Sequence, residues 1–173
     1  MVVRSRGFRV LVLIAVITVL AAIAGTVLYV HIIKTPKSPI SKEITQKVNF
    51  PLYYPDQKKL PKGYYLNQAS FISPQKDVVL YDVKYGNNQK LIFSVQPKPS
   101  DNDLQSFYSS YIPLRVKMQT VLGQADIGAY GTGKNLKTVA SLPIQNDNTW
   151  IIVTAPYNVN QDQLKKTLNS LRK

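Results

Sequence analysis

An uninterrupted apolar run over residues 10–33 constrains this chain more than any other feature. The run contains no charged residue when His31 is neutral. As a helix rising about 1.5 Å per residue it would be about 36 Å long, which exceeds the roughly 30 Å thickness of a bilayer's hydrocarbon core. We therefore predict a transmembrane helix over 10–33. Ala22-Ile23-Ala24 also fits a signal-peptide cleavage site, but the apolar run continues to Ile33. This continuation favours an uncleaved anchor.

The flanks of this run predict its orientation. Residues 1–9 carry Arg4, Arg6 and Arg9. Basic residues beside a first membrane helix are retained in the cytoplasm. The sequence thus predicts a cell-membrane protein with a single span, a short cytoplasmic basic tail over 1–9, and the rest of the chain outside.

The exported part divides into a linker and one domain. Residues 34–49 contain Pro36, Pro39 and many polar residues without an apolar period, so we expect an extended linker there. Residues 50–173 are the length of one domain and need no disulfide to bury a core. The chain has no cysteine.

Apolar periods within 50–173 predict an α+β domain. Six segments have the composition or alternation of strands: 64–72, 78–85, 91–96, 116–122, 137–143 and 149–155. The strand containing Trp150 is the most apolar and is expected to be central. Gly86-Asn87-Asn88 predicts a hairpin. Short links between strands favour an antiparallel sheet.

Two helices complete the predicted domain. A short one follows the caps at Ser100–Asp103 and ends before Pro113. The second begins near Asn160, and Leu164, Leu168 and Leu171 line one of its faces. We expect this C-terminal helix to pack on the sheet.

No motif assigns a chemistry to this domain. Gly128–Lys134 matches the core of a phosphate-binding loop, but Asn135 replaces the required hydroxyl residue and a predicted strand follows. A glycine turn between strands is the better interpretation. His31 is the only histidine, and the aspartates fall mostly in turns and caps. The sequence therefore assigns no catalytic, cofactor-binding or metal residue and predicts no enzyme and no cofactor. A Ser–Lys or carboxylate pair created by folding stays open as an alternative.

The chain is strongly basic, with a net charge of +13. Residues 34–173 contain 19 basic and 9 acidic side chains and account for +10 of this charge. Such a field attracts wall polymers, anionic lipids or nucleic acid. Scattered lysines are also typical of a solvated surface, so both interpretations stay open.

Three segments resemble a known family. Leu60-Pro61-Lys62-Gly63-Tyr64, Val121-Leu122-Gly123-Gln124-Ala125 and Asn160–Leu171 are similar to an uncharacterised bacterial extracytoplasmic domain. That domain forms the outer portion of membrane-anchored anti-sigma-factor-like proteins. The resemblance implies a sensory or accessory role without catalytic residues. The tail over 1–9 is too short to hold a sigma-binding domain.

Together these features predict a membrane-anchored envelope domain with a non-catalytic binding, sensory or accessory role. The expected partners are the membrane itself and an envelope protein or a second copy of the chain. No sequence-specific nucleic acid is predicted. A tethered hydrolase and an anionic-polymer-binding protein are the alternatives.

Overall fold

The computed structural model describes residues 38–173. The predicted cytoplasmic tail over 1–9, the predicted transmembrane helix over 10–33 and the start of the predicted linker lie outside these residues. Among residues 38–173, no helix is both long enough and apolar enough to span a bilayer.

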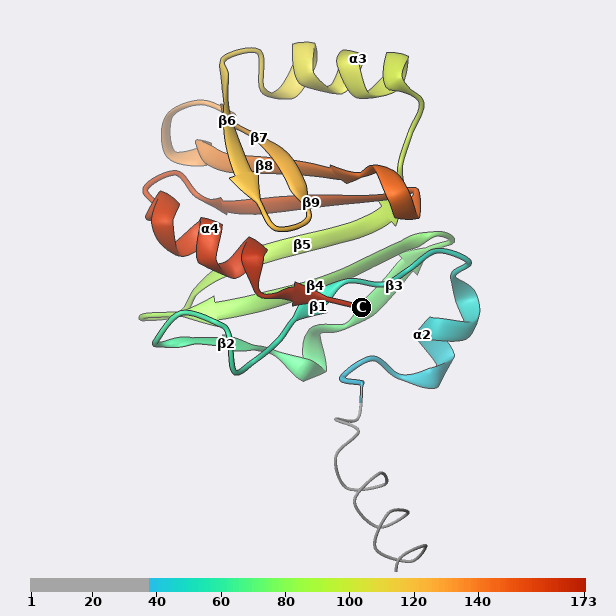
Figure 1. Ribbon diagram of the computed structural model, residues 1–173. Helices are drawn as coiled ribbons and strands as arrows, with labels where there is room; N and C mark the ends of the chain where they lie inside the picture. The colour runs from blue at the N-terminus through green and yellow to red at the C-terminus, as the bar shows by residue number, and fades with distance from the viewer. Residues whose placement is uncertain (1–37) are drawn as a thin grey trace, which may run out of the picture. The chain divides into compact units, whose positions relative to one another are not determined.

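An antiparallel sheet organises the described residues (Figure 1). Its main path runs β2-β4-β5-β9-β8-β7-β6, and β3 pairs with β4 beside β2. The bounds are β2 Tyr64–Leu66, β3 Ile72–Gln75, β4 Val78–Tyr85, β5 Gln89–Pro97, β6 Arg115–Thr120, β7 Gly123–Tyr130, β8 Lys137–Ile144 and β9 Thr149–Pro156. A separate two-stranded ladder joins β1 (Tyr54–Pro55) to β10 (Leu171–Arg172). The prediction of an antiparallel α+β domain is confirmed, and β9, with Trp150, is central as expected.

Local signals account for the regular elements. The hairpin between β4 and β5 turns at Gly86 and Asn88, whose φ angles of 52° and 61° lie in the left-handed region. Ser100 caps helix α3 (Asp101–Tyr111) by accepting from the Asp103 N–H at 3.2 Å. Asn160 caps α4 (Gln161–Asn169) in the same way, at 3.1 Å. These cap and hairpin predictions are confirmed.

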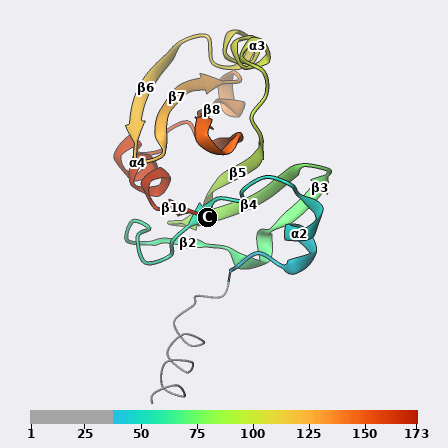
Figure 2. The ribbon, with the colours of Figure 1, turned by 45° about the vertical axis from the view of Figure 1, so that its right-hand side comes forward.

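Side chains alternate along β9, so the strand contributes to both faces of the sheet. Ile151 and Val153 point to one face and pack in the core that contains Leu164 and Leu168 of α4. Trp150 points to the other face and packs in a second core with residues of α3. We call these the α4 face and the α3 face. The two helices lie far apart with strands between them (Figure 2).

The prediction of an extended linker over 34–49 is wrong for its second half. Helix α2 (Lys42–Lys47) forms there, and the Ile44 N–H donates to the Ser41 side chain at 3.3 Å. Ile40 and Ile44 are each 8% exposed and belong to the α4-face core. Burial of these two side chains stabilises a turn that sequence propensity alone would leave marginal. The folded unit therefore begins at Ile40.

The single strand predicted over 64–72 is divided. A short 3-10 turn, η1 (Gln68–Ser70), separates β2 from β3. Ser70 explains the break, because its Oγ accepts from the Asp82 N–H at 2.8 Å. A side chain thus takes the place of a ladder bond at that point.

Two further boundaries differ from the predictions. The glycine turn predicted over 128–134 begins later than expected, because β7 continues to Tyr130, and Ala125 and Ile127 of this strand alternate into the α4-face core. The C-terminal helix ends at Asn169, and Leu171 pairs with Pro55 in the β1–β10 ladder. Leu171 nevertheless packs in the core as expected, at 6% exposure.

Candidate binding site at the β6 edge

Strand β6 forms one edge of the sheet. It pairs with β7 along one side, and no strand within residues 38–173 pairs with its other side. Three large apolar side chains on or beside it are exposed: Leu114 by 90%, Val116 by 58% and Val121 by 70%. Natural proteins usually protect such edges, because unpaired N–H and C=O groups attract other strands. An open apolar edge marks β6 as a candidate interaction site.

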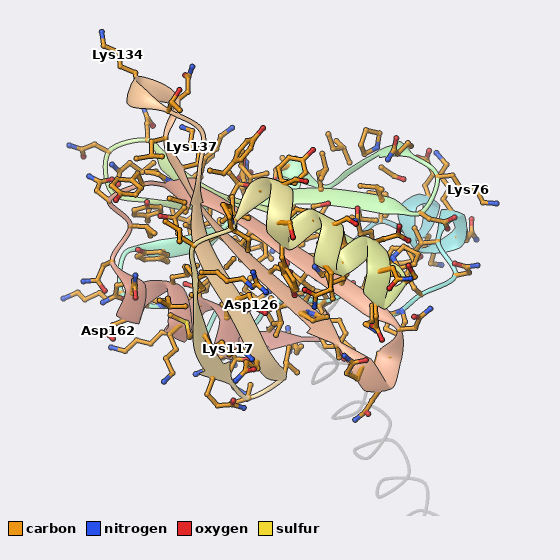
Figure 3. All side chains as sticks on the ribbon, turned by 90° about the horizontal axis from the view of Figure 1, so that it is seen from above. Lys76, Lys117, Asp126, Lys134, Lys137 and Asp162 are labelled. Atoms are coloured by element: carbon orange, nitrogen blue, oxygen red, sulfur yellow. The ribbon has the colours of Figure 1, made fainter. Side chains whose placement is uncertain are left out.

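The two faces of β6 differ in chemistry. Arg115 and Lys117 lie opposite Gly128 and Asp126 of β7 and share the α3 face. Val116 lies opposite Ile127 and faces the other way. In Figure 3, Lys117 and Asp126 lie close together on the neighbouring strands. A strand added to this edge would meet cations on one face and apolar groups on the other.

Arg115 is held in place by two neighbours. Its Nε lies 3.3 Å from Oδ1 of Asp126, and its guanidinium carbon lies 4.5 Å from the centre of the Tyr108 ring. The Arg115 and Asp126 side chains are 29% and 13% exposed. Because the closest contact is through Nε, the two terminal nitrogens are available to a second anion. The geometry between Arg115 and Asp126 is not that of a hydrogen bond, and the buried Oδ1 accepts none.

A polar chain under α3 supports this arrangement. The Trp150 indole N–H donates to Ser141 Oγ at 2.8 Å, and the Ser141 hydroxyl lies 3.4 Å from the Tyr108 hydroxyl. Burial is the main cause that raises the pKa of Tyr108. Asp126 adds to the increase, while Ser141 and Arg115 oppose it. Tyr108 therefore stays neutral, and its ring is a fixed platform for Arg115.

The fold places a lysine, an aspartate and a serine next to one another on three neighbouring strands, which bears on the alternative of a hydrolase with a Ser–Lys pair. The register places Lys117 opposite Asp126, and Asp126 opposite Ser141. At about 4.8 Å per strand, Lys117 and Ser141 are roughly 10 Å apart. Ser141 is fully buried, and its oxygen is bound by the Trp150 indole. The geometry therefore suits a structural serine rather than a nucleophile.

Two shallow grooves flank the strands β6 and β7. A groove of about 400 Å³ opens between the turn at Leu122–Gln124 and residues 143–146, with Asp126 in its wall. A second groove, of about 330 Å³, is lined by Val116, Ile127 and Tyr157, among others. Within residues 38–173, no group of three metal-binding side chains gathers in either groove or elsewhere.

The residues of the phosphate-loop match and the aspartates do not come together in one site. Gly128 lies in β7 and Lys134 in a 3-10 turn, η2 (Gly133–Asn135), and strand β8 follows. This arrangement confirms that the segment is not a strand–loop–helix phosphate site. Asp77, at φ 60°, occupies a turn, and Asp162 lies in the first turn of α4. Both positions agree with the prediction that the aspartates fall mostly in turns and caps.

Neither the role of Asp126 nor the edge position of β6 was predicted from the sequence. The alternation of basic and apolar residues from Arg115 to Met118 was the available signal, but edge position depends on strand pairing. Comparison of the chain with protein-family models, with curated proteins and with solved structures finds no match.

Proposed function

We propose that this chain is a membrane-tethered, non-catalytic binding protein of the cell envelope. Its folded domain captures an extended acidic segment of a partner protein along β6. The apolar run over 10–33 and the basic tail before it support the tether. The open edge of β6 is the observation that carries the binding role.

Main-chain pairing supplies the affinity at such an edge. β6 has six residues, and the end of α4 lies beside its C-terminal end, where the Val121 N–H donates to Asn169 Oδ1 at 2.9 Å. An added strand would therefore meet mainly the part of the edge around Arg115, Val116 and Lys117. Peptides that extend a sheet in this way gain hydrogen bonds from the backbone and specificity from alternate side chains. The exposed Val116 side chain would face apolar residues of the partner.

Charge selects an acidic partner. Arg115 and Lys117 are two residues apart and point to the same face. Acidic side chains at alternate positions of the added strand would lie beside both cations, and Arg115 is already positioned by Asp126 and Tyr108. A second copy of β6 would instead bring its own cations beside Arg115 and Lys117, and like charges on opposed strands are destabilising.

A hydrolase receives less support from the same face. Its best-aligned serine, Ser141, is fully buried. The carboxylate nearest to it, Asp126, faces Arg115 and not a second carboxylate. A binding surface uses these groups as they lie, without a rearrangement that would expose the serine.

Amide hydrogen exchange with two matched peptides tests the proposal. The full-length chain, in a mild non-ionic detergent, is mixed with an octapeptide of alternating Glu and Val or with its Lys and Val counterpart. We expect the acidic peptide to slow exchange in β6 and to bind at least about tenfold more tightly, because a tenfold change corresponds to about 1.4 kcal/mol. Protection away from β6, or equal affinity for the two peptides, would refute the proposal.

Variants separate a local charge effect from a general one. Lys117→Glu should weaken binding of the acidic peptide, whereas Lys165→Glu, an equal charge change on exposed α4, should leave it nearly unchanged. Concentration-dependent protection of β6 without peptide would instead identify a second copy of the chain as the occupant.

A further inference from the structure

Three lysines lie on the α3 face at the end of the sheet that contains the β4–β5 hairpin. Lys84 of β4 lies directly opposite Lys90 of β5, and Tyr65 of β2 lies opposite Lys84. Directly opposed residues share a face, so these three side chains point the same way. On the other half of the sheet, Lys137 of β8 lies opposite Tyr130 of β7.

The strand registers place Lys90 of β5 and Lys137 of β8 at the same level of the sheet. Ile92, Thr154 and Val139 are neighbours across β5, β9 and β8. Lys90 and Lys137 each lie two residues from this line, toward the same end of the sheet. Since side chains alternate, they also share its face. We call Lys84, Lys90 and Lys137, with Tyr65 and Tyr130 at the two ends, the lysine row.

The dimensions of the row follow from strand spacing. At about 4.8 Å per strand, Lys84 and Lys90 are about 5 Å apart. The β5–β9 pairing ends at Ile92 and Thr154, so Lys90 and Lys137 are at least about 10 Å apart, and the row from β2 to β7 is at least about 24 Å long. Figure 3 shows Lys134 beyond Lys137 at this end of the molecule and Lys76 at the opposite end.

In the part of the chain that the structure describes, the lysines of the row form no ion pair, although Asp82 lies on the same face two residues from Lys84. Within residues 38–173, the ion pairs involve other cations, and none includes Lys84, Lys90, Lys134 or Lys137. Two lysines opposed on adjacent strands also repel each other. A row of unpaired cations that lowers stability is a candidate site for an anion.

Exposed aromatic rings accompany the charges. Tyr65 is 52% exposed and Tyr130 is 45% exposed. Tyr111, 44% exposed, extends the ring surface beside Tyr130, with the two ring centres 5.1 Å apart. A cationic track with rings on which bases can stack is the usual arrangement for single-stranded nucleic acid.

We propose that the lysine row binds single-stranded nucleic acid without sequence preference. The lysines contact phosphates, and bases stack on Tyr65 and Tyr130. A track one side chain wide and at least about 24 Å long suits a single strand better than the broad plane of a lipid surface. This site uses no residue of β6 and does not depend on the peptide-binding proposal, although Tyr130 lies two residues from Gly128, the partner of Arg115.

Fluorescence anisotropy with labelled oligo(dT) tests the row on the full-length chain in a mild non-ionic detergent. Contacts with three or four phosphates predict that log K falls with log salt with a slope of about −2 to −3. The triple variant Lys84→Gln, Lys90→Gln, Lys137→Gln should lower affinity at least about tenfold at 50 mM salt and bring the slope close to zero. Changing the same three residues to Arg should preserve binding and shows that the fold is intact.

A matched triple variant controls for overall charge. Lys76, Lys165 and Lys166 lie outside the row, and their replacement by Gln removes the same charge. If this control loses as much affinity as the row variant, or if the wild-type chain does not bind oligo(dT), the proposal is wrong.

Comparing oligo(dT) with polyphosphate shows whether the row prefers nucleic acid to other polyanions. Tyr65→Leu with Tyr130→Leu should weaken oligo(dT) several-fold and leave polyphosphate binding unchanged, because polyphosphate has no rings to stack. Equal binding of the two polymers, with no effect of the tyrosine changes, would overturn the assignment to nucleic acid.

Discussion

Replacing Gly128 by alanine tests how α3 is seated on the sheet. Gly128 lies in β7 directly opposite Arg115, the first residue of β6. Its backbone is not in the left-handed region, so alanine adds no backbone strain. A Cβ at this position would instead lie 2.7 Å from Cβ of Ile112 and 3.0 Å from the Leu114 carbonyl oxygen.

Two effects of opposite sign determine the result. Alanine is intrinsically better than glycine in a strand by about 0.5–1 kcal/mol. Carbon atoms in contact prefer about 3.5–4.0 Å, so the chain at Ile112, which is fully buried, must move by about 1 Å. Overpacking of this kind costs about 1–3 kcal/mol. The two ranges combine to a net loss between about 0 and 2.5 kcal/mol. Because the close contact is with Cβ and backbone atoms rather than a flexible side-chain end, we expect a loss of about 1–2 kcal/mol, or a Tm lower by about 3–10 °C.

Urea unfolding measures the loss, and amide exchange locates it. Exchange should accelerate in β6, because the displaced residues 112–114 lead into that strand, while β4 and β5 should change least. Ala129→Ser, at the exposed neighbouring position, should change stability by less than about 0.5 kcal/mol. A Gly128→Ala chain as stable as the wild type, or more stable, would show that Ile112 is not packed against Gly128.

Three further changes test other parts of the fold. Leu168→Ala removes a fully buried side chain and should cost about 2–5 kcal/mol in urea unfolding; a loss below about 0.5 kcal/mol would mean that α4 is not docked. Lys90→Glu replaces a like-charged pair with Lys84 by an opposite one and should add about 0.2–1 kcal/mol, so an unchanged or lower stability would contradict the β4–β5 register. A hydrogen bond from the Tyr53 hydroxyl is the main cause that lowers the pKa of Asp147 in the folded chain. The stabilisation is therefore present above the ordinary aspartate pKa and is lost as pH falls through the lowered one. Asp147→Asn should flatten the acid side of the stability curve below about pH 4, and a curve parallel to that of the wild type would exclude this role.

Most of the regular elements could be predicted because their signals are local. The alternation in 78–85 predicts β4 with the observed bounds, and the turn at Gly86–Asn88 predicts its hairpin, although β5 is longer at both ends than the predicted strand over 91–96. Ser100 and Asn160 mark the starts of α3 and α4. In each case the residues that specify the element lie within or next to it.

The errors arise where distant residues decide the local structure. Helix α2 has few apolar residues, and it forms where Ile40 and Ile44 meet the α4-face core. β7 contains glycine, which suggests a turn, yet Gly128 is needed because Ile112 occupies the space beside it. No window of the sequence near either segment carries this information.

The two proposed binding surfaces could not be predicted from the sequence. β6 is an edge only because no described strand pairs with its outer side. The lysine row requires the registers of β4, β5, β9 and β8 together, since Lys90 and Lys137 are brought together by a strand that follows both in the chain. Composition indicated a basic surface but could not place its charges.

The pairing of β5 with β9 also has a kinetic consequence. β4 and β5 form one hairpin, and β6 to β9 follow one another as a second set of neighbouring strands. Each set can form from local contacts, whereas the β5–β9 seam joins segments far apart in the chain and must close a long loop. Because the lysine row crosses this seam, the row is complete only after the slow step of folding. A nascent or partly unfolded chain would hold its two halves separately, and nucleic-acid binding would then report that the whole sheet has assembled.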